Sequence, residues 1–293
     1  MNTKKIYIDG QFYDEKDAKI SVFDHGLLYG DGVFEGVRIY NGRVFMLDEH
    51  LERLYTSAHA VMLKIPILIN EFKEVILETC RKNEAREGYI RPVVTRGVGD
   101  MGVNPTGCPK ATIIVIVTTI RIYPAEYYEK GIKVVTASTQ RMSYTQVPPA
   151  VKSLSYMNNM LARLESNQAG AQEALMLNQQ GYVAECTGDN IFAIKDGQIT
   201  TPPISAGALS GITRGCVMKL CKEMGKEVKE QNMTRYDLFT ADEVFVTGTG
   251  AEIAPVREID SRIIGPACPG PLTKEIIKQF RQLTQSTGTP IFK

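Results

Sequence analysis

Alternating apolar and polar positions predict a chain of mixed α and β elements. Apolar residues at Leu51, Leu54 and Ala58 recur with a helical period and predict a helix from about residue 48 to residue 62. A second helix is expected over residues 71–82. The stretch 111–119 is apolar throughout, so we place this strand in the centre of a sheet. Further strands are expected at 6–12, 43–47 and 89–97.

A less regular stretch with a proline, residues 120–130, separates the two halves of the chain, and we place the domain linker there. The predicted domains are a small N-terminal α/β domain, residues 1–119, and a larger domain, residues 131–293. Asp196-Gly197 and residues 260–262 predict hairpin turns. The second half alternates predicted strands with predicted helices, the strands at 132–139, 173–178, 190–195 and 242–248, and the helices at 154–168, 213–225 and 272–284.

Composition and charge exclude several classes of partner. Hydrophobic residues make up 43% and charged residues 23%, as in an ordinary globular protein. The net charge of +1 gives no electrostatic reason to expect nucleic acid or an anionic membrane as a partner. No apolar run approaches the roughly 20 residues of a membrane span, and the first residues lack the apolar core of a signal peptide. We expect a cytoplasmic protein.

Cysteine and histidine usage gives no reason to expect a disulfide framework or a metal site. The six cysteines are scattered, with no C-x-x-C pair. Only three histidines, His25, His50 and His59, are present as candidate ligands. We predict no metal.

The stretch "TRGVGDMGVNP", residues 95–105, contains G-x-G-x-x-G at Gly97, Gly99 and Gly102. A dinucleotide fingerprint needs a helix directly after these glycines, so that the helix N-terminus meets the pyrophosphate. Here a proline-glycine run follows instead, and no acidic residue ends a second strand at the required distance. The pattern therefore favours a surface loop over a nicotinamide-dependent oxidoreductase.

Lys152 is a candidate nucleophile. It stands among apolar neighbours after two prolines, where partial burial would lower the pKa of its amine and allow a Schiff base to form. Residues 24–42 hold five glycines around Tyr29, Phe34 and Arg38, which is typical of a backbone that approaches a ligand closely. The helix predicted after Lys152 carries apolar residues that we expect to face inward: Leu154, Met157, Leu161 and Leu164.

Two further stretches are candidate anion sites. Gly211 and Thr213 precede a predicted helix, whose N-terminal N–H groups and dipole favour a phosphate. Residues 247–250, "TGTG", follow a predicted strand and could form a nest for phosphate or carboxylate. Together with Lys152, these sites indicate a phosphorylated cofactor held by an amine.

Six motifs in order make the chain similar to a known family. They are "HGLLYGDGVFEGVR", "GYIRPVVTRGVGDMGVNP", "VKSLSYMNNMLA", "GYVAECTGDNIF", "LSGITR" and "DEVFVTGTGAEIAPV". The chain resembles the branched-chain amino-acid aminotransferases, which are fold-type IV pyridoxal-phosphate enzymes. The resemblance implies mixed α+β and α/β structure, with a small N-terminal α/β domain and a larger C-terminal pseudo-barrel domain. It implies ping-pong transamination of leucine, isoleucine and valine with 2-oxoglutarate.

The resemblance also implies residues for the cofactor, pyridoxal 5′-phosphate. Lys152 would form the Schiff base and move the proton between the substrate Cα and the cofactor. Glu185 would pair with the pyridine nitrogen, and Tyr156 would hydrogen-bond the ring oxygen O3′. The phosphate would be held by Arg53, Ile212, Thr213 and Thr249.

On the substrate side the resemblance implies that the N–H groups of Gly250 and Ala251 bind the α-carboxylate. The side-chain pocket would be lined by Phe34, Gly36, Arg38, Tyr89 and Arg91, with Tyr29, Met101 and Val103 from a partner subunit. An apolar and aromatic lining favours branched side chains at about 0.8 kcal/mol per buried CH₂. The implied partners are small-molecule substrates and a second copy of the chain, in a homodimer or a higher homo-oligomer.

Departures from the family pattern leave the substrate range open. Cys186 stands where glycine is common, so we expect its side chain to crowd the cofactor's edge, and Gly250 replaces a frequent alanine. A D-amino-acid aminotransferase or an aminodeoxychorismate lyase of the same fold type is the alternative. The D-specific relatives usually carry an Arg-x-His pair where this chain reads Tyr89-Ile90-Arg91-Pro92, and no histidine follows His59.

Overall fold

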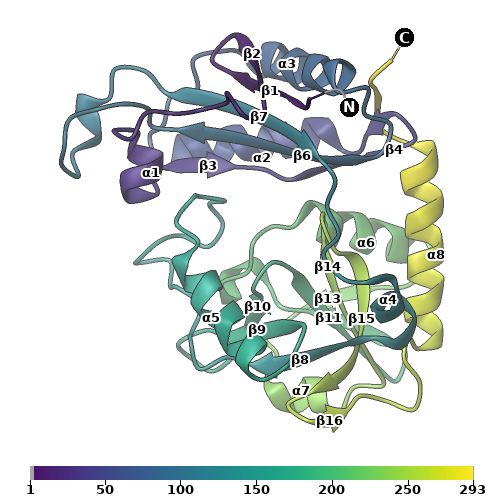
Figure 1. Cartoon of the computed structure of the whole chain (residues 1–293). Helices are drawn as coiled ribbons and strands as arrows, with labels where there is room; N and C mark the ends of the chain where they lie inside the picture. Colours follow the sequence, from purple (N-terminus) through teal and green to yellow (C-terminus); the bar gives the residue numbers. More distant parts are fainter. Residues whose placement is uncertain (1–2, 293) are drawn as a thin grey trace. The chain divides into compact units, whose positions relative to one another are not determined.

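The computed structural model describes residues 3–292, which divide into two compact units (Figure 1). Unit 1 holds the described residues up to Ile120, together with Val151–Tyr156 and residues 284–292. Unit 2 holds Arg121–Ala150 and Met157–Leu283. The segment around Lys152 and the end of the chain thus group with the first unit, whereas the sequence places both after the linker. Residues 1, 2 and 293 of the predicted domains lie outside the described part.

Unit 1 is built on an antiparallel sheet. Its strands pair in the order β17-β5-β4-β6-β7-β1-β2, and β3 also pairs with β6. The strands are β1 (Lys5–Ile8), β2 (Gln11–Asp14), β3 (Gly32–Phe34), β4 (Val37–Tyr40), β5 (Arg43–Val44), β6 (Gly88–Thr95), β7 (Thr112–Thr118) and β17 (Thr289–Pro290). The helices are α1 (His25–Tyr29), α2 (Leu47–Ala60) and α3 (Ile69–Lys82), so the two long predicted helices are confirmed.

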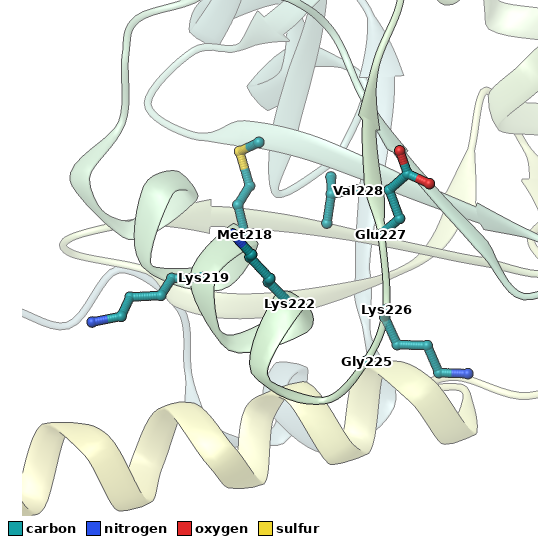
Figure 2. A pocket seen from close by; sticks show the side chains of 7 residues that line it. All are labelled: Met218, Lys219, Lys222, Gly225, Lys226, Glu227 and Val228. Atoms are coloured by element: carbon teal, nitrogen blue, oxygen red, sulfur yellow. The ribbon is translucent and has the colours of Figure 1, made fainter.

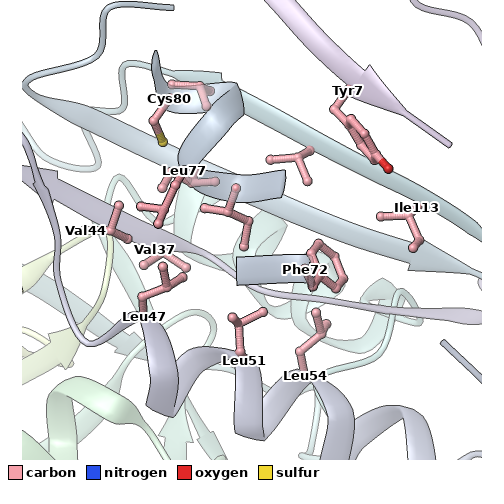
Figure 3. Close-up of a cluster of buried hydrophobic side chains, with 14 of the residues drawn as sticks. Tyr7, Val37, Val44, Leu47, Leu51, Leu54, Phe72, Leu77, Cys80 and Ile113 are labelled. Carbon is pink, nitrogen blue, oxygen red and sulfur yellow. The ribbon is translucent and has the colours of Figure 1, made fainter. Parts of the chain in front are cut away.

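Helices α2 and α3 cover one face of this sheet. The leucines of α2 and Phe72 of α3 lie in a single buried cluster with alternate residues of β7, such as Ile113 and Val115. Figure 3 shows Leu51 and Leu54 on the side of α2 that faces Phe72. Because alternate strand residues point to opposite faces, the side chains between these core positions belong to the other face of the sheet.

The glycine-rich residues 96–105 lie in the loop between the adjacent antiparallel strands β6 and β7. A short 3-10 turn, Pro105–Gly107, follows the glycines, and no α-helix lies between them and β7. Gly97 has φ +93°, and a Cβ there would come within 1.9 Å of the Lys110 carbonyl oxygen. This glycine is therefore required by a tight turn, and the stretch is a loop, as the sequence predicts.

Unit 2 is built on a mixed sheet with the order β10-β9-β8-β15-β14-β11-β12-β13, and β16 pairs with β15. The strands are β8 (Ile132–Thr136), β9 (Glu173–Leu177), β10 (Val183–Cys186), β11 (Asn190–Lys195), β12 (Gln198–Thr201), β13 (Val228–Glu230), β14 (Glu243–Gly248), β15 (Glu252–Ile259) and β16 (Arg262–Ile263). The helices are α4 (Ala125–Lys130), α5 (Met157–Gln168), α6 (Ile212–Glu223), α7 (Arg235–Phe239) and α8 (Pro271–Ser286).

Local signals in the second half are confirmed at the hairpins. Asp196 and Gly197 have φ of 48° and 76°, and Asp260 and Ser261 have φ of 47° and 63°. Two consecutive positive φ values are the geometry of a type I′ turn, which matches the twist of the paired strands. The predicted linker contains α4 and the buried Tyr123, which packs in the core of unit 2.

The prediction of which residues of α5 face the protein interior is wrong. Met157, Leu161 and Leu164 are exposed, and the helix instead buries Asn159, Ala162 and Ser166. Small side chains at these positions let the helix approach β8 and β9, where Ala162 packs in a small buried cluster with residues such as Ala174. The helix also begins three residues later than predicted, because residues 151–156 form an irregular segment with a β-bridge at Ser153 and group with unit 1.

Candidate active site

Residues 151–156 lie beside β3 in unit 1, although about 120 residues of sequence separate them from it. The Phe34 N–H donates to the Lys152 carbonyl at 3.0 Å, and Val33 forms a β-bridge with Ser153. The Lys152 N–H donates to the Ser57 hydroxyl on α2 at 3.3 Å. The backbone of Lys152 is therefore held by a strand and a helix of the same unit.

The Lys152 side chain is half-buried and has a defined place. Its ammonium donates to the Tyr156 hydroxyl at 3.1 Å and lies 4.7 Å from the centroid of the Phe34 ring. The Phe34 and Tyr156 rings meet edge to face at 5.1 Å. The structure thus brings together the amine and the phenol that the sequence assigns to one cofactor.

The same face of the sheet carries the predicted substrate residues of unit 1. The Arg91 guanidinium lies 4.6 Å from the Phe34 ring centroid and donates to the Tyr89 hydroxyl at 2.9 Å. Arg38 pairs directly with Tyr89 across β4 and β6. At Gly36 a Cβ would come within 1.8 Å of the Tyr89 hydroxyl oxygen, so this glycine is what lets Tyr89 occupy its position.

Arg53 is held by a buried carboxylate that the sequence reasoning missed. Glu35 accepts from Arg53 Nε at 2.6 Å and Nη2 at 2.8 Å, and from His50 Nδ1 at 2.7 Å. Burial alone raises the pKa of Glu35, but His50 and Arg53 outweigh it, so its pKa lies well below the usual range. Burial lowers the pKa of His50, more than Glu35 raises it. Glu35 is therefore ionised in the folded protein.

Tyr29, Met101 and Val103 form a second predicted group within unit 1. Tyr29 ends α1, and its hydroxyl accepts from the Gly102 N–H at 2.8 Å. Met101 and Val103 flank that glycine and are 73% and 85% exposed. The glycine loop therefore joins the end of α1 and presents two apolar side chains that unit 1 itself does not cover.

In unit 2, Glu185 is buried and held by three donors. Arg141 Nη2 lies 2.9 Å from its Oε1, while the Leu209 N–H and the Asn190 amide donate to its Oε2 at 2.8 Å and 3.2 Å. A register shift in the β9–β10 ladder lies between Val183 and Glu185. Such a bulge re-aims side chains, and this one lets Glu185 meet its donors.

Arg141 is held in turn by helix α5. Its Nη1 donates to the Asn159 side chain at 2.8 Å, and the Asn159 amide donates to the Thr187 carbonyl at 2.8 Å. This explains why α5 buries an asparagine where the sequence predicts leucines. Arg141 and Asn159 were not predicted as site residues, because their roles depend on contacts with residues distant in the sequence.

The candidate anion sites of unit 2 lie where chain turns expose N–H groups. Gly211 is the N-cap of α6 and has no side chain to cap the helix. Ile212 and Thr213 begin this twelve-residue helix. Thr249, Gly250 and Ala251 form the turn between β14 and β15.

A pair of buried acids, Glu173 and Asp189, supports the turn that contains Thr249. A Cβ on Gly248 would come within 2.0 Å of Asp189 Oδ1. The Tyr123 hydroxyl donates to Asp189 Oδ2 at 3.1 Å and to Glu173 Oε2 at 3.4 Å. Burial raises the pKa of Asp189 to about 7, and the charge of Glu173 acts in the same direction.

Cys186 lies in the hydrophobic core of unit 2, where burial raises the pKa of its thiol well above the usual value. Its side chain is fully buried. The expectation that this side chain crowds the edge of a cofactor is therefore corrected: the core takes up the extra volume.

A surface pocket in unit 2 lies apart from the predicted residues. It has a volume of ≈ 550 Å³ and lies beside α6 and β13 (Figure 2). Its lining residues include Met218, Lys222 and Val228, and none of the lining residues was predicted as a site residue.

Among residues 3–292, no helix is long and apolar enough to cross a membrane. No group of three or more acidic, histidine or cysteine side chains in that same range could hold a metal ion.

The raised pKa of Asp189 predicts a pH-dependent stability. Between pH 4 and pH 7 the folded protein binds a proton at Asp189 that the unfolded chain, with a pKa near 3.9, has released, so this group stabilises less as pH rises. Asp189→Asn mimics the protonated acid. We expect its free energy of unfolding, relative to wild type, to rise from pH 5 to pH 8 by on the order of 2–4 kcal/mol. Urea unfolding at both pH values measures this difference, and a difference that is the same at both would contradict the assignment.

Comparison with known proteins places this arrangement in a family. Residues 32–259 match the model of the amino-transferase class IV family. A Methanocaldococcus jannaschii protein, provisionally named a branched-chain-amino-acid aminotransferase, is 51% identical over 288 residues, which are 98% of this chain and 99% of that protein. The crystal structure of the Escherichia coli branched-chain amino acid aminotransferase superposes with a TM-score of 0.94 at 37% identity, covering 98% of this chain and 96% of the other.

A third relative was solved with a ligand. This branched-chain amino acid aminotransferase, from a source abbreviated T.th., is complexed with N-(5′-phosphopyridoxyl)-L-glutamate. It has a TM-score of 0.91 and 37% identity, covering 97% of this chain and 95% of the other. These matches confirm the predicted family and the fold-type IV architecture. The chain therefore belongs to the class IV aminotransferases.

Proposed function

We propose that this chain is a pyridoxal-phosphate-dependent aminotransferase that transfers the amino group of leucine, isoleucine or valine to 2-oxoglutarate. One observation carries the proposal. Lys152 and Arg91 lie over the same Phe34 ring, at 4.7 Å and 4.6 Å from its centroid. A nucleophilic amine and a carboxylate-binding guanidinium on one sheet face are what an enzyme for amino and oxo acids needs. Relatives with branched-chain aminotransferase names support the substrate class.

The residues fit pyridoxal phosphate. Buried Arg91 Nε and Thr247 Oγ1 have no hydrogen-bond partner in the described part of the chain, and each lies within two residues of a predicted ligand-binding residue. Buried polar atoms without partners are unfavourable, so a polar ligand that reaches either atom stabilises it. The cofactor's aldehyde suits the Lys152 amine, and its phosphate suits Arg53 and the N-terminus of α6. The relative solved with a phosphopyridoxyl-glutamate supports this cofactor.

Each residue has a role toward the cofactor. When bound, pyridoxal phosphate supplies an electron sink for the substrate Cα. Lys152 would hold the cofactor through its amine and would move the proton of the substrate Cα. Tyr156 would donate to its O3′, and Glu185, held by Arg141, would accept from the pyridine N–H. Arg53, Ile212, Thr213 and Thr249 bind the phosphate.

Other residues act on the substrate. The N–H groups of Gly250 and Ala251 bind its α-carboxylate. Phe34, Gly36 and Tyr89 line the side-chain pocket with Arg38, and burial of methyl groups there favours the branched substrates. The distal carboxylate of 2-oxoglutarate pairs with Arg91, with Tyr89 orienting that guanidinium.

Lys152→Ala tests the cofactor assignment. We expect purified wild-type protein with pyridoxal phosphate to show a visible absorbance band that borohydride removes, because the amine carries the cofactor. The variant should lack the band, whereas the exposed Lys64→Ala control should keep it. A wild-type protein that stays colourless with added pyridoxal phosphate would overturn the proposal.

Arg91→Met tests the substrate assignment. We expect the KM for 2-oxoglutarate to rise about tenfold or more, since one charge-assisted pair is lost, while the half-reaction with L-leucine changes little. Arg86→Met, which also removes a guanidinium above a ring in unit 1, is the control and should leave both unchanged. Conversion of D-alanine but not L-leucine by wild type would instead favour a D-amino-acid aminotransferase.

We also propose that the active form is a homodimer or a higher homo-oligomer in the cytoplasm. Tyr29, Met101 and Val103 are exposed on unit 1, and α5 of unit 2 exposes apolar residues such as Leu161. Apolar patches of this kind are typical of interfaces. Tyr29, Met101 and Val103 would complete the partner's substrate pocket. The six cysteines, all free thiols, support a reducing compartment.

Mixing two inactive variants tests the shared pocket. Met101→Asp should impair leucine turnover and keep the cofactor absorbance, and Lys152→Ala should be inactive. If Met101 serves the neighbouring site, random co-assembly gives mixed dimers with one intact site, so about a quarter of wild-type activity should return. Met62→Asp, at an exposed methionine of the same unit, is the control and should be active alone. No recovery in mixed dimers that form would show that Met101 serves its own subunit.

A further inference from the structure

The Glu35 carboxylate links the two functional parts of unit 1. It lies between β3 and β4, is 1% exposed, and accepts from Arg53, from His50 and, at 3.3 Å, from the Gly36 N–H. Its neighbour Phe34 donates its N–H to the Lys152 carbonyl. Arg53, His50 and Ser57 lie on one side of α2, at spacings of three and four residues. The polar side of α2 is thus joined to the strand that holds Lys152.

The geometry of the Glu35–Arg53 pair fixes the orientation of the planar Arg53 guanidinium. Glu35 engages the Nε and Nη2 edge of the guanidinium with both oxygens, at 2.6 Å and 2.8 Å. A two-point contact of this kind defines the orientation of the whole planar group, which a single contact does not. His50 donates to the same carboxylate, so Glu35 cannot rotate without breaking a second buried hydrogen bond.

We propose that Glu35, supported by His50, is the positioning residue that orients Arg53 toward the cofactor phosphate. This inference rests on the proposed function. Two effects of Glu35 on a phosphate oppose each other: its negative charge repels the anion, while its hold on Arg53 keeps the guanidinium in the binding orientation. Positioning dominates, because an unheld arginine must lose its rotamer freedom on each binding event.

Glu35→Gln separates the two effects. It removes the charge and keeps the shape, so repulsion predicts tighter phosphate binding and positioning predicts weaker binding. We expect the dissociation constant for pyridoxal phosphate, followed by cofactor absorbance, to rise about tenfold. The constant for pyridoxal, which lacks the phosphate, should stay within about twofold. Asp31→Asn breaks a matched two-point pair with Arg96 in the same unit, at 2.8 Å and 3.0 Å, and should change neither constant.

Each of the other outcomes contradicts either the role of Glu35 or the proposed function. Unchanged or tighter pyridoxal-phosphate binding in Glu35→Gln overturns the inference. Equal weakening for both ligands shows a merely structural role and also overturns it. A wild-type protein that binds neither ligand refutes the proposed function itself, whereas wild-type binding with an unaffected variant refutes only the role of Glu35.

A second pair of variants covers the case in which Glu35→Gln does not fold. His50→Asn keeps an N–H donor near the carboxylate, and His50→Leu removes it. We expect His50→Leu to weaken pyridoxal-phosphate binding by about threefold to tenfold while sparing pyridoxal, and His50→Asn to restore most of the affinity. Equal affinities in the two variants would overturn the supporting role of His50.

Discussion

The main-chain hydrogen bonds that hold residues 151–156 in unit 1 are the constraint on which the site depends. They join a segment from the middle of the chain to β3, with the Ser57 hydroxyl as a further acceptor on α2. Backbone bonds fix Lys152 more firmly than side-chain packing would, because they set the direction in which its Cβ points. The place of the ammonium above Phe34 and beside Tyr156 follows from that direction.

Glu35 in unit 1 and Glu185 in unit 2 are buried carboxylates that are each paired with an arginine, and the two pairs serve the same physical end. Glu35 is held by Arg53 and His50, and Glu185 by Arg141 and main-chain and amide donors. Burying an ionised group is costly unless it is fully paired, so such pairs contribute little to net stability. What they provide is orientation: a charged group that cannot turn presents the same edge to every ligand.

Local signals in the sequence predict local structure well. The helical period of apolar residues predicted α2 and α3, and Asp196-Gly197 predicted a hairpin turn. Each of these features depends on residues that are close together in the sequence. The motifs around Lys152 and Glu185 identified the family, yet the roles of Glu35, which holds Arg53, and of Arg141, which holds Glu185, were not predicted. These contacts join residues that are 18 and 44 positions apart, and the period of a helix or a strand does not relate residues at such separations. The prediction of the buried face of α5 is wrong because Asn159 is buried through its hydrogen bonds with Arg141 and the Thr187 carbonyl, which the apolar pattern does not indicate.

Helix α2 carries its apolar and polar stripes side by side. Leu51 and Leu54 face the core, while His50 and Arg53 donate to Glu35 and Ser57 accepts from the Lys152 N–H. Inserting a single residue would rotate everything beyond it by about 100° and exchange the stripes. A point substitution therefore alters one stripe, whereas a change of length disrupts both stripes at once. The core contacts and the site contacts of α2 therefore depend on one common spacing. Grafting the site onto another protein would require grafting this part of the core as well.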